Sequence, residues 1–329
     1  MTESSDLRVS LTTILAGRPL PIIRQAAAWV LALLSDSNTK IETLADSILH
    51  DEAFTARVLH VANSAYYRRQ KEPVTTVTQA IAMTGFNTLR DIVVAAEFVD
   101  LAQKRLPTSV NLRRLLAKAF VAGHQATALA QAVLRPQAEA LFTCALLETL
   151  GEFVLAAYLP KVYTTVGDTM QATGLPFEEA HFQATGMTPH EVTEIIFKGL
   201  DLPEGLLLPA PVWDVHGTAP DRRQAIVHLT NTCATNLFGP DSPQTVSQFN
   251  VLISRLVKTT GFRLDTVEAL LSQAYLKALE FGGHVDLGAD SFALHGTAKH
   301  PNARHGFITM CRELVERQAG KETVDRPLL

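Results

Sequence analysis

Apolar residues recur at helical spacing on both sides of a polar break at residues 50 and 51. Leu44, Ile48 and Leu49 form one apolar stripe, and the next stripe consists of Phe54, Val58, Leu59 and Ala62. Because residues four or so positions apart share one face of a helix, this pattern predicts two amphipathic helices. Asp51 stands where an N-cap carboxylate would accept hydrogen bonds from the first turn of the second helix. The pattern therefore predicts that two helices meet at residues 50 and 51.

The same periodicity continues along most of the chain. It predicts helices over residues 21–34, 39–49, 77–83, 88–95, 115–133, 138–159, 177–185, 191–200, 222–237, 245–259, 265–281 and 311–317, with a further helix beginning at 201. Gly85, Pro136 and Gly239 are among the residues that separate them, since glycine suits a helix end and proline interrupts a helix. No alternating run rich in Val, Ile and Thr is long enough to indicate a sheet. The predicted fold class is all-α, a multi-helix bundle.

Composition narrows the class of protein. With 329 residues and 47% hydrophobic content, the chain can bury a sizeable core, and its net charge of -4 gives no overall attraction to nucleic acid. The three cysteines, Cys144, Cys233 and Cys311, match no metal-binding spacing and favour a reducing compartment. The N-terminal segment is acidic, unlike a signal peptide, and no apolar run approaches the roughly 18 residues of a membrane span. We therefore expect a cytoplasmic protein with no membrane partner.

A family resemblance rests on two stretches, DEAFTARVLHVANSAYYRR and VTTVTQAIAMTGFNTLRDIVV. Together they resemble the HDOD domain, and the matching positions are Asp51, Phe54, Arg57, Val58, Leu59, Ala62, Asn63, Ser64, Ala65, Tyr67, Thr76, Val77, Ala80, Ile81, Gly85, Leu89, Arg90, Ile92 and Val93. The resemblance implies an HDOD domain of HD-like type over residues 11–238. Residues 239–329 then form a C-terminal helical extension with a Gly/His-rich loop and a polar tail.

The HDOD domain is similar to the HD-type metal-dependent phosphohydrolases, which place a His, an adjacent His-Asp pair and a distal Asp around a divalent cation. Carried over to this chain, His124 matches the first His, Glu148 and Thr149 stand at the pair, and Asn231 stands at the distal Asp. Thr149 and the neutral Asn231 are poor metal ligands. The resemblance thus implies a vestigial pocket at these four positions without metal, cofactor or catalysis. Alternatively, His124 on its Ala-rich helix is a core histidine.

Other candidate residues have both a functional and a structural interpretation. His50-Asp51 is a literal His-Asp pair, but the N-cap position of Asp51 explains it without a metal. Four histidines belong to the same region, although their spacing cannot show whether they converge: His181, His190, His216 and His228. The candidate interaction or fold-signature residues are Asn63, Ser64, Tyr66, Tyr67 and Arg90. For Asn63 and Ser64, the sequence favours a structural role at a helix end.

The resemblance implies a non-catalytic HDOD signalling protein of a bacterial signal transduction pathway. Such a protein acts through protein-protein interaction or small-ligand sensing, so the expected partner is a signalling protein or a small-molecule or nucleotide ligand. Two alternatives stay open. One is a divergent metal-dependent phosphohydrolase that uses His124 and Glu148, and the other is a nucleotide-binding protein that has lost hydrolysis. Nucleic acid is not an expected partner, because the cations beside Tyr66 and Tyr67 suit a helix C-terminus.

Overall fold

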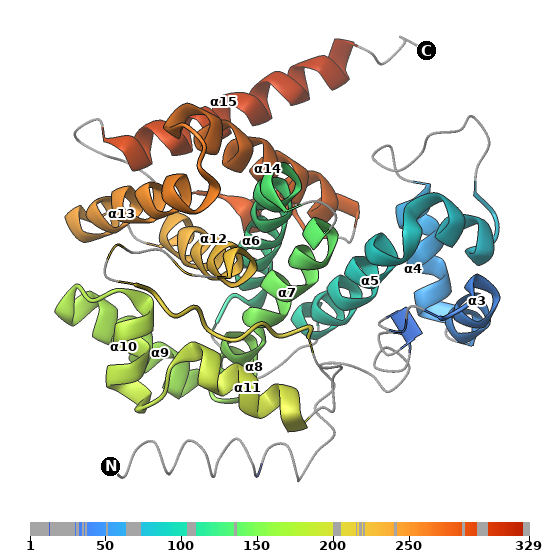
Figure 1. Ribbon diagram of the computed structural model, residues 1–329, viewed down its shortest axis with the longest axis horizontal. Helices are drawn as coiled ribbons and strands as arrows, with labels where there is room; N and C mark the ends of the chain where they lie inside the picture. The colour runs from blue at the N-terminus through green and yellow to red at the C-terminus, as the bar shows by residue number, and fades with distance from the viewer. Residues whose placement is uncertain are drawn as a thin grey trace.

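The computed structural model describes residues 13, 30, 33–34, 36, 38–50, 52–63, 74–103, 110–134, 137–199, 205–214, 216, 219, 221–239, 242–284, 287–294 and 302–324. Within these ranges the secondary structure consists of α-helices and two short 3-10 helices, with no strand. The predicted all-α class is confirmed. Figure 1 shows the helices as a group of three at one side, a central group, and further helices at two edges.

The group at the side contains α3 (Ile41–Leu49), α4 (Glu52–Ala62) and α5 (Val77–Gln103), which pack on one another (Figure 1). Most of the predicted apolar stripes is buried, with Leu44, Ile48, Phe54 and Val58 at most 1% exposed. Leu49, predicted in the first stripe, is instead 55% exposed at the end of α3. Within α5, Gly85 has φ of +81°, so the helix kinks at the residue where the sequence predicts a break. Glycine reaches this left-handed region without the steric cost that a Cβ would bring.

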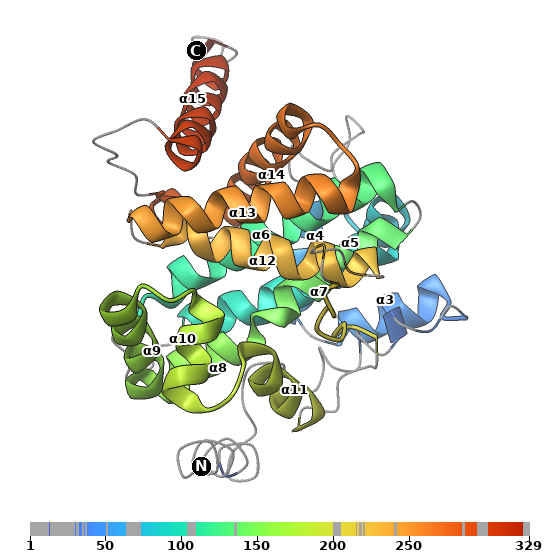
Figure 2. The ribbon, with the colours of Figure 1, turned by 60° about the vertical axis from the view of Figure 1, so that its left-hand side comes forward.

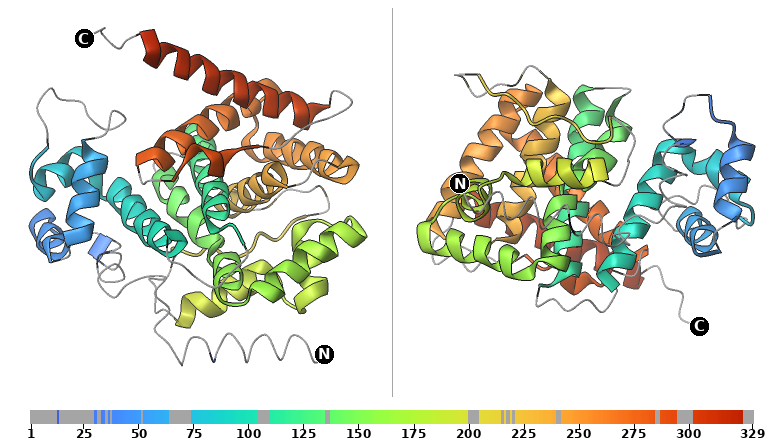
Figure 3. Two further views of the ribbon diagram at one scale, coloured as in Figure 1. Left: turned by 180° about the vertical axis from the view of Figure 1, so that it is seen from behind. Right: turned by 90° about the horizontal axis from the view of Figure 1, so that it is seen from below.

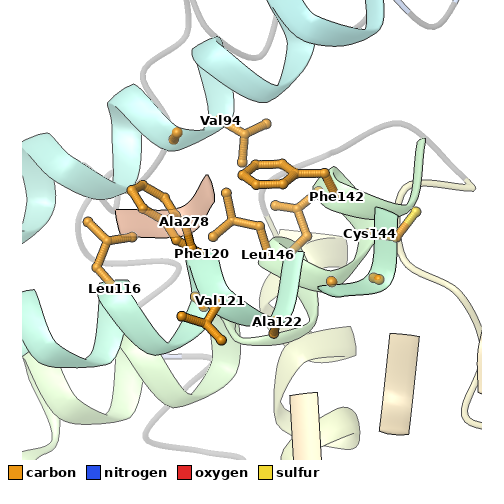
Figure 4. Packing of buried hydrophobic residues seen from close by; sticks show 14 of the residues in the cluster. Val94, Leu116, Phe120, Val121, Ala122, Phe142, Cys144, Leu146 and Ala278 are labelled. Carbon is orange, nitrogen blue, oxygen red and sulfur yellow. The ribbon is translucent and has the colours of Figure 1, made fainter. Parts of the chain in front are cut away.

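The central group contains α6 (Leu112–Val133), the 3-10 helix η1 (Gln137–Ala140), α7 (Leu141–Glu148), α8 (Leu150–Tyr158) and α12 (Arg222–Phe238). Figure 4 shows Phe120 and Leu116 of α6 packed among side chains of α5, α7 and α14. The sequence predicts one helix over 138–159, which is wrong, because α7 and α8 meet at Thr149. The Thr149 Oγ1 and N–H both donate to the carbonyl of Leu146. These bonds end α7 at Glu148.

One edge of the molecule carries α9 (Pro160–Thr173), α10 (Phe177–Thr185) and α11 (Pro189–Gly199) (Figure 1). The sequence analysis missed α9. Helix α11 approaches α8 closely at Gly151, whose N–H donates to Thr193 Oγ1 over 3.0 Å. A Cβ on Gly151 would lie 2.6 Å from that oxygen, so only glycine permits this contact. The helix predicted to begin at 201 does not extend through the described part, because residues 205–214 are not helical.

The C-terminal helices are α13 (Pro243–Thr260), α14 (Leu264–His284), the 3-10 helix η2 (Ala289–Phe292) and α15 (Ala303–Val324). Helix α14 packs on α6, α13 packs on α12, and α15 lies along the outer edge in Figure 2 and in the left view of Figure 3. A single hydrophobic core runs from Val30 to Cys311. The extension therefore shares the core of the preceding helices, and the boundary at residue 238 stays a prediction. The last helix is longer than the predicted 311–317.

One stretch, Leu141–Tyr158, is apolar and long enough to cross a membrane by length and composition. The sequence analysis expected no run of that kind. However, 89% of the stretch is buried inside the described part of the molecule, and it bends at Thr149 where α7 ends. The buried core helices of a folded domain pass the same test, so the stretch is weak evidence for a membrane span.

Candidate functional site

A cavity of about 660 Å³ lies between the α7–α8 junction, α9, α10 and α11 on one side and α12 and α13 on the other. Figure 2 shows these two sets of helices facing each other. Helix α12 contributes residues 228, 231, 232, 235 and 236, which are spaced as one face of a helix. Polar and charged residues outnumber apolar ones in the lining, and the apolar part includes Phe177, Phe182 and Leu252.

Three of the four predicted pocket residues line this cavity. Glu148 ends α7, Thr149 forms the junction with α8, and Asn231 projects from α12. The three come together because α12 packs on α7, where Asn231 Nδ2 donates to the carbonyl of Ala145. Three positions taken from the HD pattern, Glu148, Thr149 and Asn231, thus lie together at one cavity.

His124 is not among the residues that line the cavity. Its ring lies edge-on to Phe142 and Phe281, with ring centroids 4.9 Å and 5.5 Å away, and its Nε2 is inaccessible to solvent without a hydrogen-bond partner among the described residues. Burial and the charge of Lys277 lower the pKa of His124 to about 3, so its ring is neutral. The structure therefore separates His124 from the predicted pocket and makes it part of an aromatic cluster in the core.

Glu148 is bonded to a residue that the sequence analysis left unplaced. His190 Nδ1 lies 2.9 Å from Glu148 Oε1, and His190 Nε2 lies 3.6 Å from Glu194 Oε1. Burial alone lowers the pKa of His190, but the hydrogen bond and charge of Glu148, with the charges of Glu194 and Glu178, raise it above its ordinary value. The contact joins α7 to α11 across the wall of the cavity. His228 also lines the cavity, whereas His181 and His216 do not.

The His190–Glu148 contact predicts a pH-dependent contribution to stability. Because the folded state raises the pKa of His190, this contribution is complete below the unfolded value and is lost as the pH rises through the folded value. We expect Glu148→Gln, which keeps a hydrogen-bond acceptor but removes the charge, to abolish it. The measurement is urea denaturation of both proteins from about pH 5.5 to about pH 8.5, a range that spans the titration of histidine.

The quantity to compare is the difference between the wild-type and Glu148→Gln proteins at each pH. Burial lowers the pKa of His124 and of His181, which makes a contribution of opposite sign in both proteins and cancels in the difference. Thr164→Ala, at an exposed position of α9 without a titratable group, is the matched control and should leave the shape of the pH profile unchanged. A stability difference between wild type and Glu148→Gln that is constant over this range would contradict the assignment.

Asn231 holds its amide in one orientation. Its Nδ2 donates to the carbonyls of Ala145 and Val227, both at 3.1 Å, and an exchange of O and N would place oxygen against these two oxygens. The Oδ1 is buried and has no hydrogen-bond partner among the described residues. A buried acceptor without a partner costs about 1–3 kcal/mol. The Asn231 residue lines the cavity, but its unsatisfied Oδ1 is inaccessible to solvent and closed off from the cavity.

A second charged residue of the cavity wall, Glu152, is held by a network within the core. Its Oε2 accepts from Lys118 Nζ at 2.5 Å, and its Oε1 accepts from Tyr163 O–H at 2.9 Å. Both members of the ion pair are more than 90% buried at the side chain. Burial, followed by the charge and hydrogen bond of Glu152, raises the pKa of Tyr163, so its hydroxyl remains a donor. Sequence reasoning missed this network, because Lys118 and Glu152 are 34 residues apart and form no motif.

The arrangement does not fit a metal centre of the HD type. Among the described residues, no group of three or more His, Cys, Asp or Glu side chains is placed to hold a metal ion. At the positions of the HD pattern, one Glu148 oxygen contacts His190, the Thr149 hydroxyl donates to its own helix, and Asn231 offers a neutral amide. We therefore derive no chemistry through a metal at this cavity.

The remaining candidate residues lie in the side group of helices. Asn63 uses its amide fully, because Nδ2 donates to Leu59 and Val74 carbonyls at 2.8 Å and Oδ1 accepts from the Val74 N–H at 2.7 Å. This ties the end of α4 to the segment before α5. Arg90 is buried within α5. Ser64, Tyr66 and Tyr67 lie outside the described residues, as does Asp51 of the literal His-Asp pair.

Comparison with known families decides the affiliation. The HDOD domain matches residues 20–210, which is more than half of the chain. The chain belongs to the HDOD family. The matched range includes Glu148, Thr149 and His190 and ends before α12, which supplies Asn231. No curated protein gave a significant match.

Solved structures share the HDOD fold at low sequence identity. An HDOD domain protein of unknown function from Geobacter sulfurreducens has a TM-score of 0.63 and 20% identity, with 86% of this chain and 99% of that chain covered. A proposed phosphohydrolase from Shewanella amazonensis SB2B has a TM-score of 0.58 and 19% identity, covering 86% and 98% of the two chains. A proposed signal transduction protein from Marinobacter aquaeolei VT8 has a TM-score of 0.53 and 14% identity, covering 80% and 59%. These likenesses show the fold.

Proposed function

We propose that this HDOD protein is a non-catalytic module of bacterial signal transduction, acting in the cytoplasm by binding. The observation that carries the proposal is the use made of the HD positions. Glu148 Oε1 and Asn231 Nδ2 are committed to contacts that join α7 to α11 and to α12. They leave a cavity of about 660 Å³ beside these contacts, within the range of small-ligand sites.

Hydrolysis of a phosphoester at this site would need an activated water. In the HD pattern a metal ion lowers the pKa of that water, and the ligand positions here are occupied by Thr149 and a neutral amide. His190 is already bonded to Glu148, and the raised pKa of His190 reduces its neutral fraction and with it its capacity as a general base. These features favour retention of a bound ligand over its turnover.

A signalling role agrees with the description of the Marinobacter structure as a proposed signal transduction protein. The description of the Shewanella structure as a proposed phosphohydrolase corresponds to the alternative of a divergent hydrolase. In a binding module, the occupied and empty cavities differ in the packing of α10, α11 and α13. That difference would be passed to a partner protein.

Hydrolysis assays on the purified full chain test the absence of catalysis. The substrates are p-nitrophenyl phosphate and cyclic diguanylate, each with added Mn²⁺ or Mg²⁺, and we expect no turnover above the buffer. Glu148→Ala serves as the matched variant. Turnover by the wild-type protein that is lost in Glu148→Ala would refute the proposal and favour the hydrolase. Stabilisation by a nucleotide without turnover, seen as a thermal shift, would favour the nucleotide-binding alternative.

A further inference from the structure

The strap, residues 205–214, is an irregular segment at the side of the cavity. Figure 1 shows it as an unwound trace that runs from the side of α11 toward α12. Ala210 of the strap lines the cavity. From residue 206 to residue 213, no backbone group has a hydrogen bond to another described residue. A segment without backbone hydrogen bonds opens at a lower free-energy cost than the helices around it.

The two ends of the strap are attached in different ways. At the first end, residues 206–208 pack against the hydrophobic core, and Leu206 is 5% exposed. The carbonyl oxygen of Gly205 also lies 4.0 Å from the Cys144 Sγ of α7. At the other end, the one side chain packed against the core is that of Trp213, which is partly buried. The first end is therefore part of the core, whereas the second end depends on a single aromatic ring.

Trp213 connects the strap to two helices. Its ring centroid lies 5.9 Å from that of His228 on α12, and the guanidinium carbon of Arg255 on α13 lies 5.1 Å from the Trp213 centroid. A guanidinium above an indole ring makes a favourable cation–π contact. His228 and Arg255 both line the cavity. The contacts that hold the second end of the strap are thus made by residues of the cavity itself.

We propose that the strap is a gate of the cavity, with its hinge at the buried residues 206–208 and its latch at Trp213. When Trp213 leaves His228 and Arg255, Ala210 moves out of the lining and the cavity opens beside α12. When the contacts of Trp213 form again, the strap covers the occupant. This inference rests on the proposed binding function and adds how the cavity is opened. Opening is a property of the empty protein, so its test needs no ligand.

A cysteine placed inside the cavity measures the opening. Thr232 lines the cavity one helical turn after His228, and Thr232→Cys is a small change in volume. The rate at which N-ethylmaleimide labels this thiol is followed by mass spectrometry of the full-length protein, which identifies each labelled position. The three native cysteines are buried and supply a slow background. We expect Trp213→Ala to raise the labelling rate at position 232 about tenfold, because the latch is lost.

Two further variants and one native cysteine separate the latch from a general loosening of the fold. Val212→Ala, at the neighbouring position with 76% exposure, is the matched control and should leave the labelling rate unchanged. Arg255→Gln removes the stacked cation and should raise the rate about two- to fivefold, so it decides if Trp213→Ala fails to fold. Cys144, beside the hinge, should keep its slow background rate in every variant.

Each contrary result overturns a stated part of the gate. Labelling at position 232 that neither Trp213→Ala nor Arg255→Gln accelerates overturns the gate itself. An increase in Val212→Ala equal to that in Trp213→Ala overturns the latch. Labelling of Cys144 at the same raised rate overturns the hinge, because the whole strap has then left the core. The proposed binding function fails separately, by release of phosphate from p-nitrophenyl phosphate, which the labelling rates do not measure.

Discussion

Arg304→Ala is expected to lower the free energy of unfolding by about 3 kcal/mol or more. Arg304 of α15 is 0% exposed. Its Nε donates to Asn236 Oδ1 at 3.2 Å, and its Nη2 donates to the carbonyls of Asn236, Leu237 and Gly239 at 3.0–3.2 Å. These carbonyls belong to the C-terminal end of α12, where a helix leaves acceptors without partners and attracts positive charge. Truncating Arg304 to alanine removes the guanidinium that donates to all of these acceptors and leaves the end of α12 buried without hydrogen-bond partners for its carbonyls.

Urea denaturation of Arg304→Ala and of two companion proteins measures this effect. Arg304→Lys keeps the charge but lacks the planar fork of donors, so it should recover only part of the stability. Arg317→Ala, at a position of the same helix with a side chain 74% exposed, should change stability by about 0.5 kcal/mol or less. A loss in Arg304→Ala no larger than that in Arg317→Ala would mean that α15 is not held at this point.

Lys118→Met is expected to cost about 3–5 kcal/mol, because it leaves the charge of Glu152 in the core without its partner. Lys118 and Glu152 join α6 to α8 at 2.5 Å, and both side chains are less than 10% exposed. Methionine matches the length of the lysine stem, so the loss reports the buried carboxylate more than a cavity. The measurement is again urea denaturation, at a pH near neutral.

Removing both charges should recover most of that loss. A buried ion pair replaced by apolar residues of similar volume is often neutral in stability, so Lys118→Met with Glu152→Leu should be far less destabilised than Lys118→Met alone. Tyr163 O–H then lacks its acceptor, and adding Tyr163→Phe should recover about another 1 kcal/mol. If the double variant is as unstable as the single one, packing and not charge explains the loss.

Most of the fold follows from helical periodicity and its punctuation. The kink at Gly85 was predictable, because its φ of +81° is a conformation that glycine adopts far more readily than other residues. The bend at Thr149 is hidden, because the apolar run on both sides is continuous and threonine occurs in helix interiors as well. Helix α9 is missed for a related reason: its sequence, PKVYTTVGDTMQAT, has a single buried apolar residue, Val166, and poor helix formers. Tertiary packing, which local periodicity does not report, determines both the bend at Thr149 and the formation of α9.

The candidate site was predictable only where a family pattern supplied the register. Glu148, Thr149 and Asn231 are found through the HD positions, and the structure brings them to one cavity. His124 was assigned through the same HD pattern, but it lies in the aromatic core, as the alternative of a core histidine expected. His190 lies 42 residues from Glu148, and no periodicity predicts which helices face each other at that distance.

The attachment of α15 has a consequence for how the molecule responds to its surroundings. Arg304 is bonded to backbone carbonyls and an amide, which carry no titratable proton, whereas His190 and Glu148 form a contact that changes with protonation. Mild alkalinity therefore weakens the seam between α7 and α11 and leaves the seam between α12 and α15 unchanged. A shift in pH near neutrality therefore acts on this wall of the cavity, while the Arg304 contact that attaches the C-terminal helix keeps its charge.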